Sequence, residues 1–309
     1  MTTMTSTMPS LPTSNLWSKD FLERHHLLGH VYRRTQEKDY YPYWKNQLTR
    51  NFVVKSELEK IGDDLLKEGI TVCLLKGYSL MGDVYEDWGE RFASDVDILI
   101  SLQNLWKLSD ILKMYGYEKR TEKKWLGNRY KFVFEKKIGD SSIVVEVHTQ
   151  LFWHKALDIE NGLKESQVSG FSVLSFENQL IHLCGHLAFQ HTYLKLFWLM
   201  DIFKFVERFK DQIDWKLFWK EAQSSRLYKS CYFTLFLCQK LGLNIQTILY
   251  TAPKKGRSSI YLLKKIVNYQ FLYDPRKHPL RFLMVKNLIK DSYLDNLRYW
   301  YAWAKRPQN

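Results

Sequence analysis

Strand-type sequence is confined to the middle of the chain, and this distribution limits the possible folds more than any other feature. Short β-branched and apolar segments are typical of strands. Four such segments occur, at 71–77, 94–100, 129–136 and 142–151. Elsewhere apolar residues recur at three- and four-residue spacing, which predicts helices at 16–35, 43–68, 78–85 and 103–115, and throughout the chain beyond 175. We therefore expect an α+β fold with a small mixed β-sheet, flanking helices and a C-terminal helical bundle.

These changes of pattern divide the chain into four predicted parts. Residues 1–15 are polar and lack an early basic residue, so we expect a disordered tail and no secretory signal. The other parts are N-terminal helices at 16–70, an α/β core at 71–160 and a helical domain at 161–309. No run of about 18 apolar residues occurs, which predicts that the chain has no transmembrane segment.

Positive charge is concentrated near the C-terminus. The chain has a net charge of +13, and residues 222–309 contain 16 Lys and Arg against 3 Asp and Glu. Such a region attracts an anionic partner, which would be a nucleotide, an RNA, an acidic peptide or a lipid surface; charge alone does not choose among them, and improved solubility is the simpler interpretation. The four cysteines lie in apolar runs without CxxC spacing, which predicts reduced core residues in a cytoplasmic protein.

Carboxylates at alternate strand positions are the sharpest local feature. Asp95 and Asp97 stand in SDVDILI, and strand residues two apart share a face, so both side chains point the same way. Adjacent anions on an apolar strand are costly unless a cation compensates them, and Mg²⁺ favours carboxylates together with phosphate oxygens. Glu146 in SIVVEVHTQL would complete a two-cation site, with His148 on its face. Solvated positions at a loop edge or on an exposed strand are the alternative.

Groups suited to holding phosphate precede the carboxylates. Lys76 and Gly77 end the first predicted strand, and Arg91 stands four residues before Asp95. Glycine lets the backbone approach a ligand closely, and the N–H groups at the start of a helix bind anions. The two cations would neutralise triphosphate charge.

The segment LLKGYSLMGDVYEDWGERFASDVDILI at 74–100 resembles the uncharacterised nucleotidyltransferase family of the DNA polymerase beta-like nucleotidyltransferase superfamily. The resemblance continues through 111–118, VVEVH at 144–148 and the helical stretch 183–203. It implies a nucleotidyltransferase core and a metal-dependent enzyme that transfers a nucleoside monophosphate from a nucleoside triphosphate to an acceptor, releasing pyrophosphate. Mg²⁺ or Mn²⁺ would be the metal, and ATP is the expected triphosphate.

The same resemblance implies roles for individual residues. The catalytic and metal-binding carboxylates would be Asp95, Asp97 and Glu146. The nucleotide-facing residues would be Lys76, Gly77, Ser79, Arg91 and Ser94. Five further positions match the family and would bind the acceptor or position the other residues; they are His148, His186, His191, Lys195 and Asp201. The chain departs from the usual pattern in three places: it has Lys-Gly in place of Gly-Ser or Gly-Gly, Glu146 in place of Asp, and Lys195 in place of Arg.

Two alternatives stay open. One is a related phosphotransfer with the same metals, because it needs the same carboxylates. The other is a non-catalytic module that binds a nucleotide, an RNA or a partner protein on a degenerate nucleotidyltransferase fold. Retention of all three carboxylates favours catalysis. The acceptor is open among a small molecule, a peptide and an RNA, and the basic helical domain at 161–309 would select an anionic one.

Overall fold

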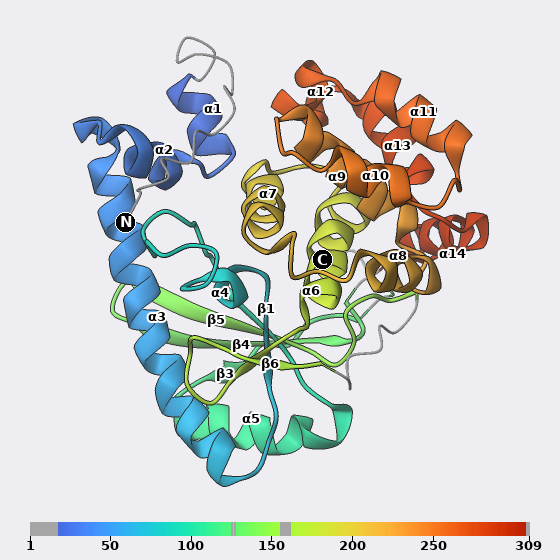
Figure 1. Cartoon of the computed structure of the whole chain (residues 1–309). Coiled ribbons are helices and arrows are strands. Elements are labelled where there is room, and N and C mark those ends of the chain that lie inside the picture. Colours follow the sequence, from blue (N-terminus) through green and yellow to red (C-terminus); the bar gives the residue numbers. More distant parts are fainter. Residues whose placement is uncertain (1–17, 125, 127, 155–161, 307–309) are drawn as a thin grey trace. The chain divides into compact units, whose positions relative to one another are not determined.

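The computed structural model describes residues 18–124, 126, 128–154 and 162–306. It has a mixed α+β fold with one seven-stranded sheet, flanking helices and a C-terminal half made of helices (Figure 1). The predicted fold class is therefore confirmed. The tail predicted at 1–15 lies outside the described residues. The chain forms two compact units: a sheet unit (27–182 and 292–306) and a helical unit (18–26 and 183–291).

The sheet unit is built around strands in the order β3-β4-β5-β2-β1-β7-β6. The strands are β1 Cys73–Leu75, β2 Val96–Leu99, β3 Glu118–Lys119, β4 Lys131–Ile138, β5 Ser141–His148, β6 Lys164–Glu165 and β7 Ser172–Val173. β2 pairs antiparallel with β1 and parallel with β5, so the sheet is mixed. The hairpin β4–β5 turns at Gly139 and Asp140 as predicted. β6 and β7 pair antiparallel with each other, and at two residues each these strands are too short to show an alternating pattern.

Two helices of the sheet unit pack against one face of the sheet. These are α3 (Tyr41–Lys67) and α5 (Leu105–Met114) (Figure 1). Their apolar residues share a core with the inward side chains of β2 and β5; this core includes Leu58, Ile61, Leu108, Ile111, Val96, Ile98, Val145 and Val147. Because strand side chains alternate between faces, the residues between these apolar ones point to the opposite face. On β2 and β5 that face carries the charged residues.

The remaining elements of the sheet unit are short, and two of them correct the predicted boundaries. The single helix expected at 16–35 is interrupted at His26, which has a φ of 55°, and forms α1 (Lys19–Arg24, in the helical unit) and α2 (Leu28–Thr35). The helix expected at 78–85 is α4 (Lys76–Leu80). The other elements are the 3₁₀-helices η2 (Lys38–Tyr40) and η3 (Leu102–Asn104), and α14 (Tyr293–Ala304).

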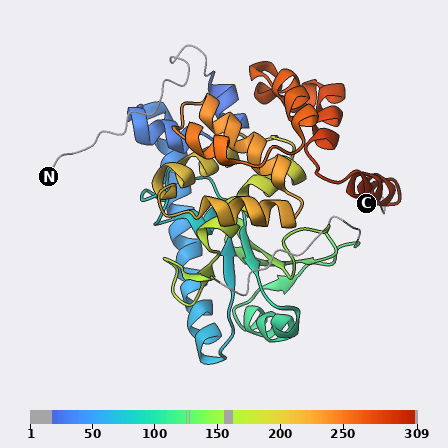
Figure 2. The ribbon, with the colours of Figure 1, turned by 45° about the vertical axis from the view of Figure 1, so that its right-hand side comes forward.

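The helical unit contains no strand among its described residues (Figure 2). After α6 (Phe176–Cys184) and the π-helix η4 (Gly185–Gln190) come α7 Phe197–Phe209, α8 Trp215–Ser224, α9 Tyr228–Lys240, α10 Gln246–Thr251, α11 Arg257–Ile266, α12 Tyr269–Tyr273, η5 Pro275–Lys277 and α13 Pro279–Leu288. Cys184, Cys231 and Cys238 are free and buried here, as Cys73 is in the sheet unit, which confirms the core positions predicted for the cysteines.

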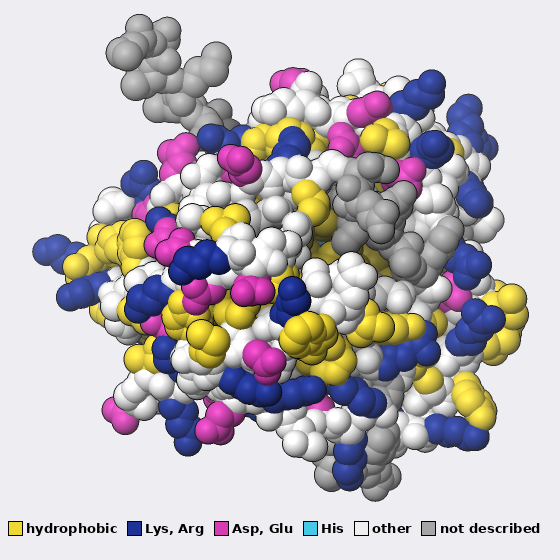
Figure 3. Space-filling view, turned by 90° about the horizontal axis from the view of Figure 1, so that it is seen from below, with side chains coloured by type: hydrophobic (Ala, Val, Ile, Leu, Met, Phe, Trp, Pro, Cys, Tyr) yellow, Lys and Arg dark blue, Asp and Glu magenta, His cyan; other side chains and the backbone are white. Residues whose placement is uncertain are grey.

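Side chains of several kinds share the surface. On the face drawn in Figure 3, hydrophobic groups are exposed among Lys, Arg, Asp and Glu. Trp106 and Met114 of α5 are examples of exposed hydrophobic residues in the sheet unit. Across the described part of the chain, no helix is both long enough and apolar enough to cross a membrane.

The contact between α3 and the loop before β7 predicts an unusual effect of a helix substitution. Replacing glycine by alanine inside a helix normally stabilises it by about 1 kcal/mol. A Cβ at Gly62, however, would lie 2.1 Å from the carbonyl oxygen of Ser169. We therefore expect Gly62→Ala to lower the free energy of unfolding by about 2 kcal/mol, measured by urea denaturation. The neighbouring exposed Asp63→Ala is the control and should change it by no more than about 0.5 kcal/mol. Stabilisation by Gly62→Ala would contradict the close packing.

Candidate active site

The register of three adjacent strands brings the candidate residues together. Asp97 of β2 stands directly opposite Glu146 of β5, in the parallel pair, and opposite Leu75 at the end of β1. Lys76 follows Leu75 and begins α4, while His148 lies two residues beyond Glu146 at the end of β5. Residues distant in sequence therefore share the sheet face opposite α3 and α5.

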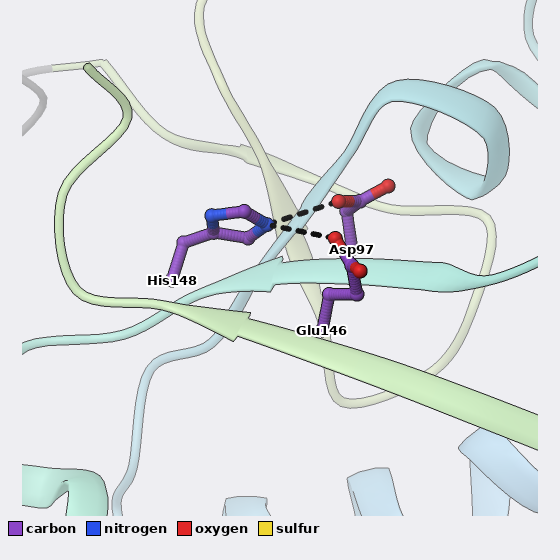
Figure 4. Close-up of side chains that lie close together, drawn as sticks. All are labelled: Asp97, Glu146 and His148. Carbon is purple, nitrogen blue, oxygen red and sulfur yellow. Dashed lines mark hydrogen bonds and ion pairs between the residues drawn. The ribbon is translucent and has the colours of Figure 1, made fainter. Parts of the chain in front are cut away.

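Asp97, Glu146 and His148 form a group with metal-ligand chemistry (Figure 4). One ligand atom from each lies within 4.8 Å of the others. His148 Nε2 is 2.9 Å from Asp97 Oδ1 and 3.9 Å from Glu146 Oε2. Asp97 is buried, whereas Glu146 and His148 are half-buried. The predicted pair Asp97 and Glu146 is therefore brought together, and His148 joins it as a potential ligand.

Two lysines balance these carboxylates. The Lys76 ammonium pairs with Asp97 Oδ1, and Lys131 Nζ lies 2.6 Å from Glu146 Oε1. Burial opposes the charge of Asp97, but Lys76 and the His148 hydrogen bond hold the pKa of this carboxyl below its ordinary value. Burial likewise opposes the charge of Lys131, and the Glu146 carboxylate overcomes it, so that the pKa of Lys131 is raised. The site thus keeps Asp97 and Lys131 in their charged forms despite their burial, because each has a partner of opposite charge.

Asp95 lies directly before β2 and outside the three-residue group. The hydroxyl of Ser94 donates to Asp95 Oδ1 at 2.8 Å. Burial, and after it the Asp97 charge, raise the pKa of Asp95, and Glu146 acts in the same direction. The three predicted carboxylates therefore repel one another through space. Counting these three carboxylates against the Lys76 and Lys131 ammonium groups leaves a charge of −1.

The predicted phosphate-binding residues surround the start of α4. A Cβ at Gly77 would lie 3.4 Å from Arg91 Nη1, so the buried guanidinium rests against this glycine. Asn51 of α3 fixes the preceding loop, because its amide donates to the Arg91 carbonyl at 3.1 Å. Ser79 is buried, donates to the Lys76 carbonyl and accepts from Gln179 Nε2, both at 2.7 Å. Its hydroxyl therefore ties α4 to α6.

Four predicted residues belong to the helical unit. The rings of His186 and His191 lie 4.4 Å apart between centroids, and each lies 4.7 Å from Trp198. Lys195 Nζ donates to the Arg24 carbonyl at 2.5 Å. Asp201 on α7 is fully buried. Their roles toward an acceptor stay predictions.

Two residues near the carboxylates escaped the predicted set. Lys131 stands opposite His148 in the β4–β5 hairpin, and counting back from the Gly139–Asp140 turn would have found it on the Glu146 face. His182 is buried on α6, where desolvation and then the Lys76 charge lower its pKa to about 3. No local pattern marks His182, because the contact between α6 and the sheet depends on the tertiary fold.

A model described as uncharacterised nucleotidyltransferase matches residues 19–242. The chain belongs to this uncharacterised nucleotidyltransferase family, which confirms the resemblance found in the sequence. A search of curated proteins found no match.

Several solved structures are similar. A solution structure of the antibiotic-resistance factor ANT(2'')-Ia has 12% identity and a TM-score of 0.34, covering 52% of this chain and 94% of that one. A crystal structure of ANT(2'')-Ia with adenylyl-2''-tobramycin has 15% identity and a TM-score of 0.32, covering 61% and 94%. An antigenic nucleotidyltransferase-like protein from Paracoccidioides brasiliensis has 13% identity and a TM-score of 0.41, covering 66% and 94%.

The buried pair of Lys76 and Asp97 predicts a large cost for losing one partner. Both side chains are largely shielded from solvent, at 12% and 5% exposure. We expect Lys76→Met to lower the free energy of unfolding by about 3 kcal/mol, because it leaves a buried carboxylate without its cation. The double variant Lys76→Met with Asp97→Asn should recover most of this loss. Urea denaturation measures both, and a single-variant cost below about 1 kcal/mol would contradict the desolvated pair.

The buried His182 predicts a pH dependence of stability. Its folded pKa of about 3 lies below the ordinary 6.5, so between these values the unfolded chain binds a proton that the native chain excludes. Stability must therefore fall as the pH drops below 6.5, by at most about 1.4 kcal/mol per pH unit from this group. We expect His182→Gln to flatten the dependence, measured by urea denaturation on either side of neutral pH. Equal slopes for the two proteins would show that His182 protonates freely.

Proposed function

We propose that this chain transfers a nucleoside monophosphate from a nucleoside triphosphate, with ATP as the first candidate, to an acceptor hydroxyl and releases pyrophosphate. The observation that carries the proposal is the placement of Asp97 opposite Glu146, with Asp95 beside them and Lys76 and Arg91 at the start of α4. Membership of the nucleotidyltransferase family supports the same chemistry. We assign the reaction to the cytoplasm, as the buried free cysteines suggest.

The carboxylates fit a hard divalent cation. Asp97 and Glu146 offer oxygen ligands close together, Asp95 stands two residues before Asp97, and the negative charges of the three favour a further cation. Asp95, Asp97 and Glu146 would hold Mg²⁺ or Mn²⁺, which supplies charge neutralisation at the triphosphate and favours deprotonation of the acceptor hydroxyl. The His148 imidazole beside Asp97 suits Mn²⁺ better than Mg²⁺ if it binds directly; otherwise it orients the Asp97 carboxylate through their hydrogen bond.

The chain's own groups position the reactants and receive the proton. Lys76 and Arg91 would pair with phosphate oxygens, and the Gly77 backbone allows a phosphate to approach. The acceptor oxygen forms a bond to the α-phosphorus while the bond from that phosphorus to the bridging oxygen of pyrophosphate breaks. The acceptor proton passes to Glu146. We assign acceptor selection to the basic helical domain at 161–309, where His186, His191, Lys195 and Asp201 are the candidate contacts.

One observation favours the non-catalytic alternative. Lys76 and Lys131 already neutralise Asp97 and Glu146 without a metal. A chain that only binds nucleotide or RNA would keep these two ion pairs. In the catalytic proposal, Asp97 and Glu146 would hold a divalent cation in place of the two lysines, and Lys76 would pair with phosphate. The two possibilities therefore differ in whether nucleotide binding depends on a divalent cation.

The decisive experiment uses two conservative variants. Asp97→Asn removes a buried carboxylate charge, whereas Asp110→Asn removes an exposed one on α5. We expect one of the four triphosphates to raise the melting temperature of the wild type and of Asp110→Asn only with Mg²⁺ or Mn²⁺, and to leave folded Asp97→Asn unchanged. Transfer of labelled nucleotide should fall at least about 100-fold in Asp97→Asn. Metal-independent binding, equal in all three proteins, would support the binding module instead.

A further inference from the structure

The helical unit contains a pocket whose lining combines aromatic rings with cations. It lies between α9, α10, α11 and the loop 252–255, and has a volume of about 280 Å³. We call it the basic aromatic pocket. Its lining includes Tyr250, Tyr261, Lys254, Lys255, Arg257 and Lys264, and no Asp or Glu. Pockets for whole small molecules usually have roughly 300–1,000 Å³, so this one suits a single unit of a longer ligand.

Specific contacts hold the pocket in shape. α9 packs against both α10 and α11 (Figure 1). The Tyr228 hydroxyl at the start of α9 donates to the Pro253 carbonyl, which fixes the loop to the helix. Gly256 has a φ of 64° and begins α11 against the Lys229 side chain. These contacts make the pocket a built feature of the unit.

The cations of the pocket lack acidic partners. Lys254, Lys255 and Arg257 are exposed, and neither they nor Lys264 forms an ion pair within the described residues. The Asp291 carboxylate accepts from the backbone N–H groups of residues 228 and 229 at 2.7 and 3.0 Å, and it acts on Lys255 through space without an ion pair. Four cations that form no ion pair fit a ligand with several negative charges, such as successive phosphates.

The tyrosine rings of the pocket indicate which kind of polyanion it would bind. Tyr250 and Tyr261 are 75% and 58% exposed, which leaves aromatic surface open to stacking, although the Lys265 ammonium covers one face of Tyr261 at 4.6 Å from the ring centroid. Tyr232 also lines the pocket and packs beside Trp219, with ring centroids 6.3 Å apart. Nucleobases stack on tyrosine, whereas the carboxylates of an acidic peptide offer no ring to stack. Aromatic faces beside unpaired cations therefore match a nucleobase with its flanking phosphates.

We propose that the basic aromatic pocket binds single-stranded nucleic acid. A base stacks on Tyr250 or Tyr261, and the adjoining phosphates pair with Lys254, Lys255 and Arg257. A single strand is required because the bases of a duplex are stacked on each other and cannot reach a pocket ring. The proposal does not rest on nucleotidyl transfer, since this binding needs neither a metal nor a triphosphate.

Fluorescence anisotropy of the full chain, without metal, tests the proposal with labelled oligonucleotides of about 12 nucleotides, as RNA, DNA and duplex. The wild type should bind single strands more tightly than the duplex. Tyr250→Ala with Tyr261→Ala should weaken binding about 5- to 100-fold through lost stacking. Lys254→Glu with Lys255→Glu should weaken it at least about 10-fold and reduce its salt dependence.

The matched control changes the same charge outside the pocket. Lys216→Glu with Lys220→Glu alters two exposed lysines of α8 and should leave affinity within about 2-fold. The proposal is overturned if this control loses as much affinity as the pocket variant, if the tyrosine variant binds like the wild type, or if heparin competes as well as a single strand. Circular dichroism of each variant shows that a loss does not come from unfolding. A single strand that binds independently of the pocket residues would also overturn the proposal.

Discussion

The parallel pairing of β2 with β5 is the constraint on which the candidate site depends. It sets Asp97 opposite Glu146, and the alternation of strand side chains sends both away from the core shared with α3 and α5. A shift of one residue in either strand would turn its carboxylate toward the core and its apolar side chains toward the opposite face. The hydrophobic core therefore fixes the position of the charged groups.

Charge balance then determines what this face can bind. Like charges brought together by the register are tolerated because cations from neighbouring segments meet them: Lys76 comes from the end of β1 and Lys131 from β4. The three carboxylates still outnumber these two ammonium groups by one. Under the proposed function, Asp97 and Glu146 would exchange these internal ion pairs for contacts with a divalent cation, and Lys76 would pair with a phosphate instead.

The sequence was sufficient for the features that depend on local pattern. Alternation and the Gly139–Asp140 turn identified the hairpin, and the spacing in SDVDILI and VVEVH identified the carboxylates that meet. The sequence predicts that Glu146 lies on a strand near Asp97, but the register that sets the two residues opposite each other is specified by no short pattern. The short strands β6 and β7, and the burial of His182 near Lys76, could not be predicted from local sequence patterns. Each depends on residues that come together only in the tertiary fold.

Lys76 has a backbone conformation that normally favours glycine. Its φ of 47° lies in the left-handed region, where a residue with a Cβ is strained by about 1 kcal/mol or more and glycine is not. At this position the chain has a lysine, and its ammonium group pairs with Asp97. The strained turn therefore places a positive charge against a buried carboxylate, a contact that a glycine in the same conformation would not make.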